Sequence, residues 1–259
     1  MDSRLNEHGQ RIGLPVPDWR GARPPVREVV TGAFCRLEPL DADRHADALF
    51  EAYAADPEGV DWTYLPYGPF PDPAAYRAWL AGKQAARDEC FFAIVDPKRD
   101  APVGVAAYLR IQPETGSIEV GHLRHAPALQ RTVASTEAMF LMMKRVFDDW
   151  GYRRYEWKCD RLNAPSRAAA TRLGFRYEGV FRQLMVVKGR NRDTAWFSIL
   201  DAEWPAIRAA FEAWLDPSNF DAQGRQRRRL EAWMPPSAGR PIVVDADTMG
   251  TGQAANERG

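Results

Sequence analysis

Residues 163–179, NAPSRAAATRLGFRYEG, contain a short helix, its two boundaries and the start of a strand. Asn163 is a residue type preferred at helix N-termini, and Ser166 follows it in the first helical turn. Gly174 closes the helix, because glycine adopts at no steric cost the left-handed backbone conformation that ends many helices. Phe175 then begins a stretch rich in apolar and aromatic residues, which predicts a strand. The segment therefore predicts a helix, a tight turn and a strand in direct succession.

Hydrophobic periodicity predicts further helices and strands on both sides of this segment. The predicted strands are 34–40, 91–95, 103–110, 117–124, 154–159, 175–187 and 194–200, and the predicted helices are 43–53, 72–87, 134–150, 164–173 and 202–215. Elements in this order fold into a mixed sheet covered by helices on both faces, which is an α/β (α+β) architecture.

The composition places one folded domain between two tails. The chain has 259 residues, of which 45% are apolar, and this is enough for one substantial core. Residues 1–30 hold several prolines without hydrophobic periodicity, so they are predicted to form an extended arm with Trp19 as an anchor. Residues 31–215 form the predicted domain. Residues 216–259 form a C-terminal extension that we expect to be largely disordered after about residue 235, where large apolar side chains are few.

Charge and cysteine content argue against several classes of function. Lys and Arg together number 35, as do Asp and Glu, so no net field favours nucleic acid or an anionic membrane surface. The basic run at residues 225–229 is interpreted as a solvated helix face. Three widely spaced cysteines, Cys35, Cys90 and Cys159, predict neither disulfides nor a metal site. No stretch has the length and apolar character of a membrane span or a leader peptide, so we expect a cytoplasmic protein.

A second informative stretch is residues 117–138, SIEVGHLRHAPALQRTVASTEA, which predicts a strand, a loop and the start of a helix. Together with Asn163, Ser166 and the Leu-Gly-Phe and Glu-Gly steps of the first stretch, it resembles the GNAT superfamily of N-acetyltransferases, in particular the RimJ/RimL-like branch. The resemblance covers about residues 31–215. It implies the GNAT fold, with a mostly antiparallel mixed sheet in which one pair of neighbouring strands splays apart.

The resemblance also implies acetyl-CoA as the acyl donor, with its pantetheine arm between the splayed strands and its pyrophosphate at a helix N-terminus. The residues implied to contact the donor are His122, Leu123, Arg124, Gln130, Arg131, Thr132, Val133, Ala134, Ser135, Thr136, Asn163 and Ser166. The N–H of Leu123 is expected to polarise the thioester carbonyl. Val133 and Ser135 stand where the family's motif has small residues. The pyrophosphate site survives this departure, because backbone N–H groups and the helix dipole form it and any non-proline residue supplies an N–H.

The chemistry implied by the resemblance is direct attack of an amine on the thioester. Glu119 is the first candidate for the base, with Asp160 as a second candidate; the alternative is a strand carboxylate without a catalytic role. Ser166 matches the position whose hydroxyl protonates the departing sulfur, although a first-turn serine also satisfies backbone groups. His122 and His125 are interpreted as packed or hydrogen-bonded histidines, and no metal is indicated.

The aromatic, proline-stiffened loop at residues 61–70 is the candidate acceptor site, where Trp62, Tyr64 and Tyr67 would contact the substrate; a loop packed in support of the core is the alternative. The expected acceptor is a primary amine of a small molecule, a lysine or a protein N-terminus, and a homodimer is left open. Two functional alternatives stay open as well. One is a non-catalytic acyl-CoA-binding regulatory module, and the other is an enzyme whose donor carries a larger group such as succinyl.

Overall fold

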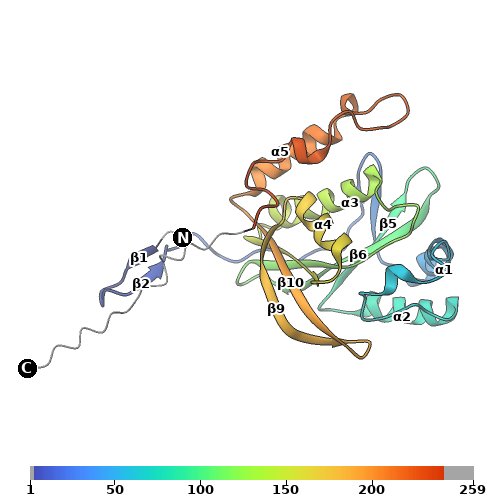
Figure 1. Ribbon diagram of the computed structural model, residues 1–259, viewed down its shortest axis with the longest axis horizontal. Coiled ribbons are helices and arrows are strands. Elements are labelled where there is room, and N and C mark those ends of the chain that lie inside the picture. The colour runs from blue at the N-terminus through green and yellow to red at the C-terminus, as the bar shows by residue number, and fades with distance from the viewer. Residues whose placement is uncertain (1–2, 242–259) are drawn as a thin grey trace, which may run out of the picture.

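The computed structural model describes residues 3–241 of the chain. Its main sheet has eight strands in the order β3-β4-β5-β6-β7-β8-β10-β9, and this confirms the predicted mixed sheet (Figure 1). The strands of this sheet are β3 (Val30–Thr31), β4 (Arg36–Pro39), β5 (Cys90–Asp96), β6 (Ala101–Gln112), β7 (Ser117–His125), β8 (Arg154–Asp160), β9 (Arg176–Val187) and β10 (Arg190–Leu200).

Strands β7 and β8 run parallel and separate part of the way along. The other neighbouring pairs of the main sheet are antiparallel. Residues Ser117–Val120 pair with Arg154–Trp157, and the pairing stops there although β7 continues to His125 and β8 to Asp160. The facing edges of the two strands therefore have no ladder between them beyond Val120. This is the splayed strand pair that the resemblance to the GNAT superfamily implied.

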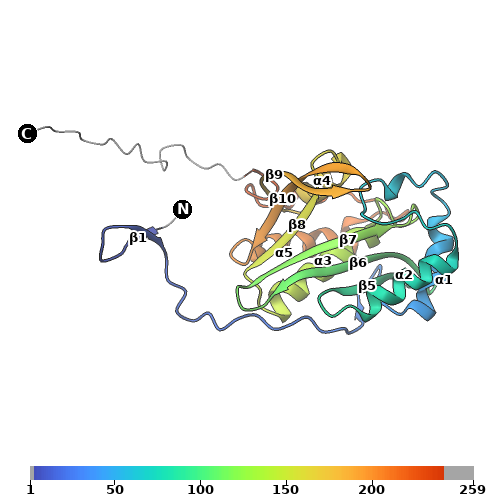
Figure 2. The same ribbon diagram turned by 90° about the horizontal axis from the view of Figure 1, so that it is seen from below.

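Helices cover both faces of the sheet, as predicted (Figures 1 and 2). Helices α1 (Ala42–Tyr53) and α2 (Pro73–Ala85) pack on one face, where Leu49, Leu80 and Phe91 are fully buried. The other face carries α3 (Val133–Lys144), α4 (Ala164–Arg172) and α5 (Trp204–Leu215). No helix in residues 3–241 is long and apolar enough to cross a membrane.

The helix predicted over residues 134–150 is divided into two elements. Helix α3 ends at Lys144, and the chain continues as one π-helical turn, Arg145–Asp149. The buried guanidinium of Arg145 lies 4.8 Å from the centroid of the Trp150 ring and pairs with Glu28 of the N-terminal arm at 3.4 Å. A π-turn of this kind is a single-turn change of hydrogen bonding within a helical stretch, which is too short for hydrophobic periodicity to reveal.

The N-terminal arm contains a small hairpin that sequence periodicity did not predict. Strands β1 (Ser3–Leu5) and β2 (Arg11–Gly13) pair with each other and are too short to show an alternating pattern. The Trp19 side chain attaches the arm to the domain, since its indole N–H donates to the Glu114 carbonyl at 2.8 Å.

The described part of the C-terminal extension packs on the domain. Two 3-10 turns, Pro217–Asn219 and Leu230–Ala232, lie in it, and the Leu230 side chain is fully buried. The basic run at residues 225–229 lies in an irregular segment, so its interpretation as a helix face is wrong. Residues 235–241 lie against the end of α4, where the Gly239 N–H donates to the Gly174 carbonyl at 3.3 Å. The disorder expected after residue 235 falls mostly on residues 242–259, which lie outside the described residues.

Candidate active site

A β-bulge lies in β7 at the point where the strand leaves β8. Val105 of β6 pairs with Arg124 and Ala107 pairs with Gly121, so one residue of β6 faces two residues of β7. The extra residue is accommodated at His122, whose φ of 52° is in the left-handed region. The bulge turns His122 toward the aromatic side chains of the α2 face, whereas Leu123 packs against the core on the opposite face. Side chains on both faces of the sheet thus approach the splay.

A cleft of about 1290 Å³ opens on the α3 face beside the splay. Its walls come from the end of β7, the loop before α3, the first turn of α4 and the C-terminal extension. Ten of the residues predicted to contact the donor line it: Leu123, Arg124, Gln130, Arg131, Thr132, Val133, Ser135, Thr136, Asn163 and Ser166. His122 and Ala134 are not among the side chains that line the cleft.

Free backbone donors lie at the start of α3. Thr132 caps the helix, since its hydroxyl oxygen accepts a hydrogen bond from the Ser135 N–H at 3.1 Å. The N–H groups of Arg131, Val133 and Ala134 have no hydrogen-bond acceptor within residues 3–241. The Val133 side chain packs against the core, so its branched Cβ occupies space on the inner side of the helix. Unpaired N–H groups and the positive end of the helix dipole together form an anion site.

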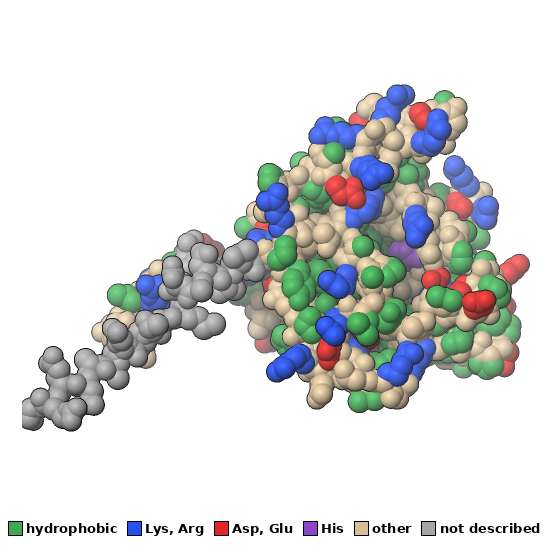
Figure 3. Space-filling view, viewed as in Figure 1, with side chains coloured by type: hydrophobic (Ala, Val, Ile, Leu, Met, Phe, Trp, Pro, Cys, Tyr) green, Lys and Arg blue, Asp and Glu red, His purple; other side chains and the backbone are tan. Residues whose placement is uncertain are grey.

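Positive side chains surround this anion site. Lys and Arg side chains gather over α4, α5 and the C-terminal segment on the face drawn in Figure 3. Arg131, Arg172 and Arg225 line the cleft itself. The Arg172 guanidinium donates to the Thr136 hydroxyl at 3.0 Å, and burial lowers its pKa below the ordinary value. The cleft therefore suits a ligand that bears several phosphates, although the chain as a whole has no net charge.

The first turn of α4 presents a serine hydroxyl to the same cleft. The Asn163 side chain accepts the Ser166 N–H at 3.0 Å and so caps the helix, as predicted. The Ser166 hydroxyl oxygen accepts the indole N–H of Trp157 at 3.0 Å. Trp157 is the last residue of β8 that pairs with β7, so this contact fixes the hydroxyl beside the splay. Because the oxygen is the acceptor here, this bond does not use the hydroxyl hydrogen, although the hydroxyl also faces the buried thiol of Cys159.

The carboxylate of Glu119 is buried on the opposite face of β7. Its Oε2 atom lies 2.7 Å from the Arg110 guanidinium and 2.8 Å from the Lys158 ammonium. A Cβ on the neighbouring Gly121 would lie 2.9 Å from Cδ2 of Leu109, so glycine at this position leaves room for the Leu109 side chain. Burial raises the pKa of Glu119, and the two cations oppose this rise. The second candidate base, Asp160, accepts the Leu162 N–H at 2.8 Å within a turn.

His122 is the centre of a polar contact that sequence reasoning missed. Its Nε2 atom lies 2.9 Å from Glu89, and its Nδ1 atom lies 3.0 Å from the Tyr67 hydroxyl. Glu89 escaped notice because it is distant in sequence and precedes an apolar strand without any motif. His125 lies on the other face, where its Nδ1 atom is 3.2 Å from the Ser135 hydroxyl and burial lowers its pKa to about 4.

The candidate acceptor loop, residues 61–70, has one buried aromatic side chain, Trp62, and two aromatic side chains with polar contacts, Tyr64 and Tyr67. Trp62 is 5% exposed and packs edge-on against Tyr53, which is a supporting role in the core. The Tyr64 hydroxyl donates to the Leu162 carbonyl at 3.1 Å. Lys188, in the turn between β9 and β10, donates to the Trp62 carbonyl at 2.8 Å and joins this hairpin to the loop. Tyr67 is thus the member of the predicted trio whose hydroxyl contacts the bulged strand.

The Arg124 side chain makes contacts other than the donor contact that was predicted for it on β7. The side chain is 2% exposed and pairs with Asp56 at 3.3 Å and Asp61 at 3.0 Å. Its guanidinium also lies 4.6 Å from the centroid of the Trp62 ring. It therefore ties the acceptor loop to β7. Within residues 3–241 no group of three His, Cys, Asp or Glu side chains could hold a metal ion.

Known proteins share this fold and this site region. Residues 35–176 match the acetyltransferase (GNAT) domain. A GCN5-related N-acetyltransferase from Brucella melitensis is 46% identical, with a TM-score of 0.82 over 84% of this chain and 99% of that chain. The uncharacterized N-acetyltransferase p20 of Bacillus licheniformis is 29% identical over 166 residues, which span 61% of this chain and 89% of that protein. The structure of RimL, a ribosomal L7/L12 alpha-N-protein acetyltransferase, in complex with coenzyme A has a TM-score of 0.57 at 19% identity, over 68% of this chain and 99% of that chain.

The chain belongs to the GNAT family and is an acetyltransferase. The family uses acetyl-CoA as donor, and RimL-type acetyltransferases are among the structures that share its fold.

Proposed function

We propose that the protein transfers the acetyl group of acetyl-CoA to a primary amine by direct attack. The observation that carries the proposal is the splay of β7 from β8, with a phosphate-compatible cleft beside it. The unpaired N–H groups of Arg131, Val133 and Ala134 would hold the donor's diphosphate. The facing edge of β7 beyond Val120 would pair with the pantetheine arm as an added strand does.

The residues around the splay supply what thioester aminolysis requires. The Leu123 N–H would polarise the thioester carbonyl as negative charge develops on its oxygen. The Ser166 hydroxyl, fixed by Trp157, would donate its proton to the departing sulfur. Two candidate groups for removing the acceptor's proton lie on the α2 face, namely Glu119 and the Tyr67 hydroxyl bonded to His122.

The acceptor is a primary amine of a small molecule, a lysine or a protein N-terminus in this proposal. It would enter from the α2 face beside Tyr67, opposite the donor cleft. The proposed setting is the cytoplasm, where the free and buried thiols of Cys35, Cys90 and Cys159 would stay reduced.

Release of coenzyme A thiol tests the proposal. Purified protein is mixed with acetyl-CoA and a panel of alkylamines, aminoglycosides, amino acids, lysine peptides and peptides with free N-termini. We expect one acceptor class to raise thiol release well above the hydrolysis background. Binding of acetyl-CoA by calorimetry, with no acceptor above background, would instead support the regulatory module. Faster turnover with succinyl-CoA would reassign the donor.

A further inference from the structure

A chain of four hydrogen-bonded side chains lies beside the bulge on the α2 face. The Lys83 ammonium donates to Glu89 at 2.7 Å, and the other oxygen of Glu89 lies 2.9 Å from Nε2 of His122. Nδ1 of His122 lies 3.0 Å from the Tyr67 hydroxyl. The four residues come from α2, the start of β5, the β7 bulge and the acceptor loop. Separate elements thus converge on one imidazole.

The charges in this chain fix the tautomer of His122. Burial alone would raise the pKa of Glu89, but the hydrogen bonds from Lys83 and His122 lower it, so the carboxylate is ionised. An ionised carboxylate only accepts, so Nε2 of His122 carries the hydrogen. Nδ1 of the neutral ring then accepts the Tyr67 hydroxyl hydrogen. Both ring nitrogens are occupied, and the phenol oxygen is the free end of the chain.

The other candidate base has a different electrostatic setting. Arg110 and Lys158 both bind Oε2 of Glu119, and the Lys158 ammonium also lies 3.6 Å from the centroid of the Trp196 ring. Burial raises the pKa of Glu119, and the two cations at one oxygen oppose this rise. The charges that face His122 include one carboxylate, Glu89, which stabilises an imidazolium, against the more distant Lys83 and Arg110.

We propose that Tyr67 is the group that takes the acceptor's proton, acting through His122 and Glu89. The inference rests on the proposed function and names the proton route of that site. Tyr67 would touch the acceptor and is the catalytic residue of the set. His122 and Glu89 act through it and are positioning residues.

The proton transfers balance as follows. The acceptor ammonium gives one proton to the Tyr67 oxygen while the phenol's own proton moves to Nδ1 of His122, which leaves a neutral amine and an imidazolium paired with Glu89. The C–N bond then forms and the C–S bond breaks, and the amine's second proton reaches the coenzyme sulfur through Ser166.

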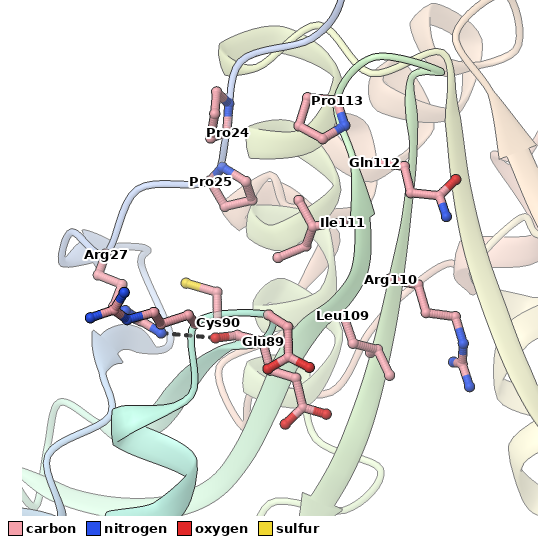
Figure 4. A pocket seen from close by; sticks show the side chains of 12 residues that line it. Pro24, Pro25, Arg27, Glu89, Cys90, Leu109, Arg110, Ile111, Gln112 and Pro113 are labelled. Atoms are coloured by element: carbon pink, nitrogen blue, oxygen red, sulfur yellow. Dashed lines mark hydrogen bonds between the residues drawn. The ribbon is translucent and has the colours of Figure 1, made fainter.

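After the product leaves, Nδ1 of the imidazolium returns its proton through the Tyr67 oxygen to solvent, which restores the ring protonated on Nε2. Glu89 borders a cavity of about 630 Å³ between the N-terminal arm and the end of β6 (Figure 4). The carboxylate therefore lies between the imidazole and a solvent-accessible space, where Arg27 anchors the backbone by donating to the Glu89 carbonyl at 2.8 Å.

Kinetics of conservative variants test the relay. Tyr67→Phe and His122→Gln should each lower kcat by about 100-fold, because general-base catalysis contributes at least this much. Glu89→Gln should lower kcat. It should also move the acid limb of the pH–rate profile to lower pH, because Glu89 raises the pKa of His122. His45→Gln is the matched control. It removes another buried histidine–glutamate pair, in which Nε2 of His45 lies 3.2 Å from the Glu38 carboxylate, and it should leave kcat unchanged. Wild-type-like unfolding temperatures would show that the variants fold.

The pH dependence separates a proton carrier from a structural histidine. Burial lowers the pKa of His122 below 6.5, so the ring is neutral at pH 7. The rate of wild type relative to His122→Gln should therefore fall as the pH drops through this pKa. A ratio that stays constant with pH, or a larger loss in Glu119→Gln than in His122→Gln, would overturn the relay.

A spectroscopic readout remains valid even if the wild type turns over no amine. Nitrogen-proton correlation spectra of the imidazole should show hydrogen on Nε2 of His122 at neutral pH. An Nδ1-protonated ring would overturn the relay whether or not the protein is active. Absence of wild-type thiol release together with an Nε2-protonated ring would count against the proposed function alone.

Discussion

Ser166 is held by two contacts in which its hydroxyl hydrogen takes no part. Asn163 binds its N–H and Trp157 binds its oxygen, so the side chain is oriented before any ligand arrives. Orientation of this kind supports proton donation to a leaving group. The motif spacing in the sequence predicted the residue, but only the structure shows that an indole from β8 positions it.

The first prediction concerns this hydroxyl. Ser166→Ala should lower kcat by about 100-fold while the affinity for acetyl-CoA stays within about threefold, because a proton donor acts on the departing thiolate rather than on binding. Steady-state thiol release and calorimetry measure the two quantities. Ser117→Ala, outside the cleft, is the control and should behave as wild type. Full activity in Ser166→Ala would assign the serine a structural role.

The second prediction concerns the buried carboxylate of Glu119. Lys158→Met should destabilise the fold by about 3 kcal/mol at pH 7, because it leaves a buried carboxylate with one cation fewer. Burial already raises the pKa of Glu119, and loss of Lys158 raises it further. A folded-state pKa above the unfolded value means that the folded protein binds the proton more tightly. The loss in the free energy of unfolding should therefore shrink as the pH falls from 7 toward 5, as urea denaturation at several pH values will show. An equal loss at every pH would contradict this.

Residue patterns indicated part of the proposed site. Glu119 and Ser166 lie in motifs with recognisable spacing, so the sequence indicated them. Glu89 became visible only when the fold brought it to His122, which lies 33 positions later and 2.9 Å away. The buried pairing of Arg124 was hidden for the same reason, because its carboxylate partners lie in a distant loop.

At the scale of elements, the proposed diphosphate site is the start of α3. Because backbone N–H groups would bind the diphosphate there, the proposal expects the identity of the Val133 side chain to matter little. Secondary structure of this kind was predictable from periodicity and caps, with boundaries within a few residues. The bulge at His122 and the π-turn after Lys144 were not, because each is a local shift of hydrogen-bond register that affects too few residues to be recognised in a periodic pattern.

A proline substitution tests the backbone role directly. Val133 is the first residue of α3, a position where proline is tolerated, and the preceding Thr132 has the extended conformation that proline requires, with ψ of 166°. Val133→Pro should keep the helix but weaken acetyl-CoA binding by about tenfold or more, since a hydrogen bond to a charged group is worth about 1.5–3 kcal/mol. Val133→Ala retains the N–H and controls for lost packing. Equal affinities in the two variants, measured by calorimetry, would contradict the proposed diphosphate site.

At the scale of the whole molecule, the C-terminal extension lines the cleft that we propose for the donor. Arg225 and Gln226 line the cleft, and the buried Leu230 attaches the segment to the domain. The sequence suggested a separate tail because polar and basic residues dominate there. The buried Leu230, the side-chain contacts of Asn219 and the packing of Phe220, Trp233 and Met234 on the core hold the segment in place, and such irregularly spaced contacts leave no periodic signal.

Loss of this attachment should affect both stability and binding. Leu230→Ala should lower the free energy of unfolding by about 3 kcal/mol, as expected for a fully buried leucine, and should also weaken acetyl-CoA binding. Chemical denaturation and calorimetry provide the two values. Val186→Ala changes a side chain that is 79% exposed and should alter neither. Unchanged donor affinity in Leu230→Ala would show that the extension is not part of the donor site.

A structure determined with bound coenzyme A would be the decisive measurement. We predict diphosphate oxygens within hydrogen-bonding distance of the Val133 and Ala134 N–H groups, and a pantetheine chain that passes between β7 and β8 beyond Val120. Coenzyme bound on another surface, or a diphosphate that makes no contact with the first turn of α3, would contradict the donor site and the reaction proposed for it.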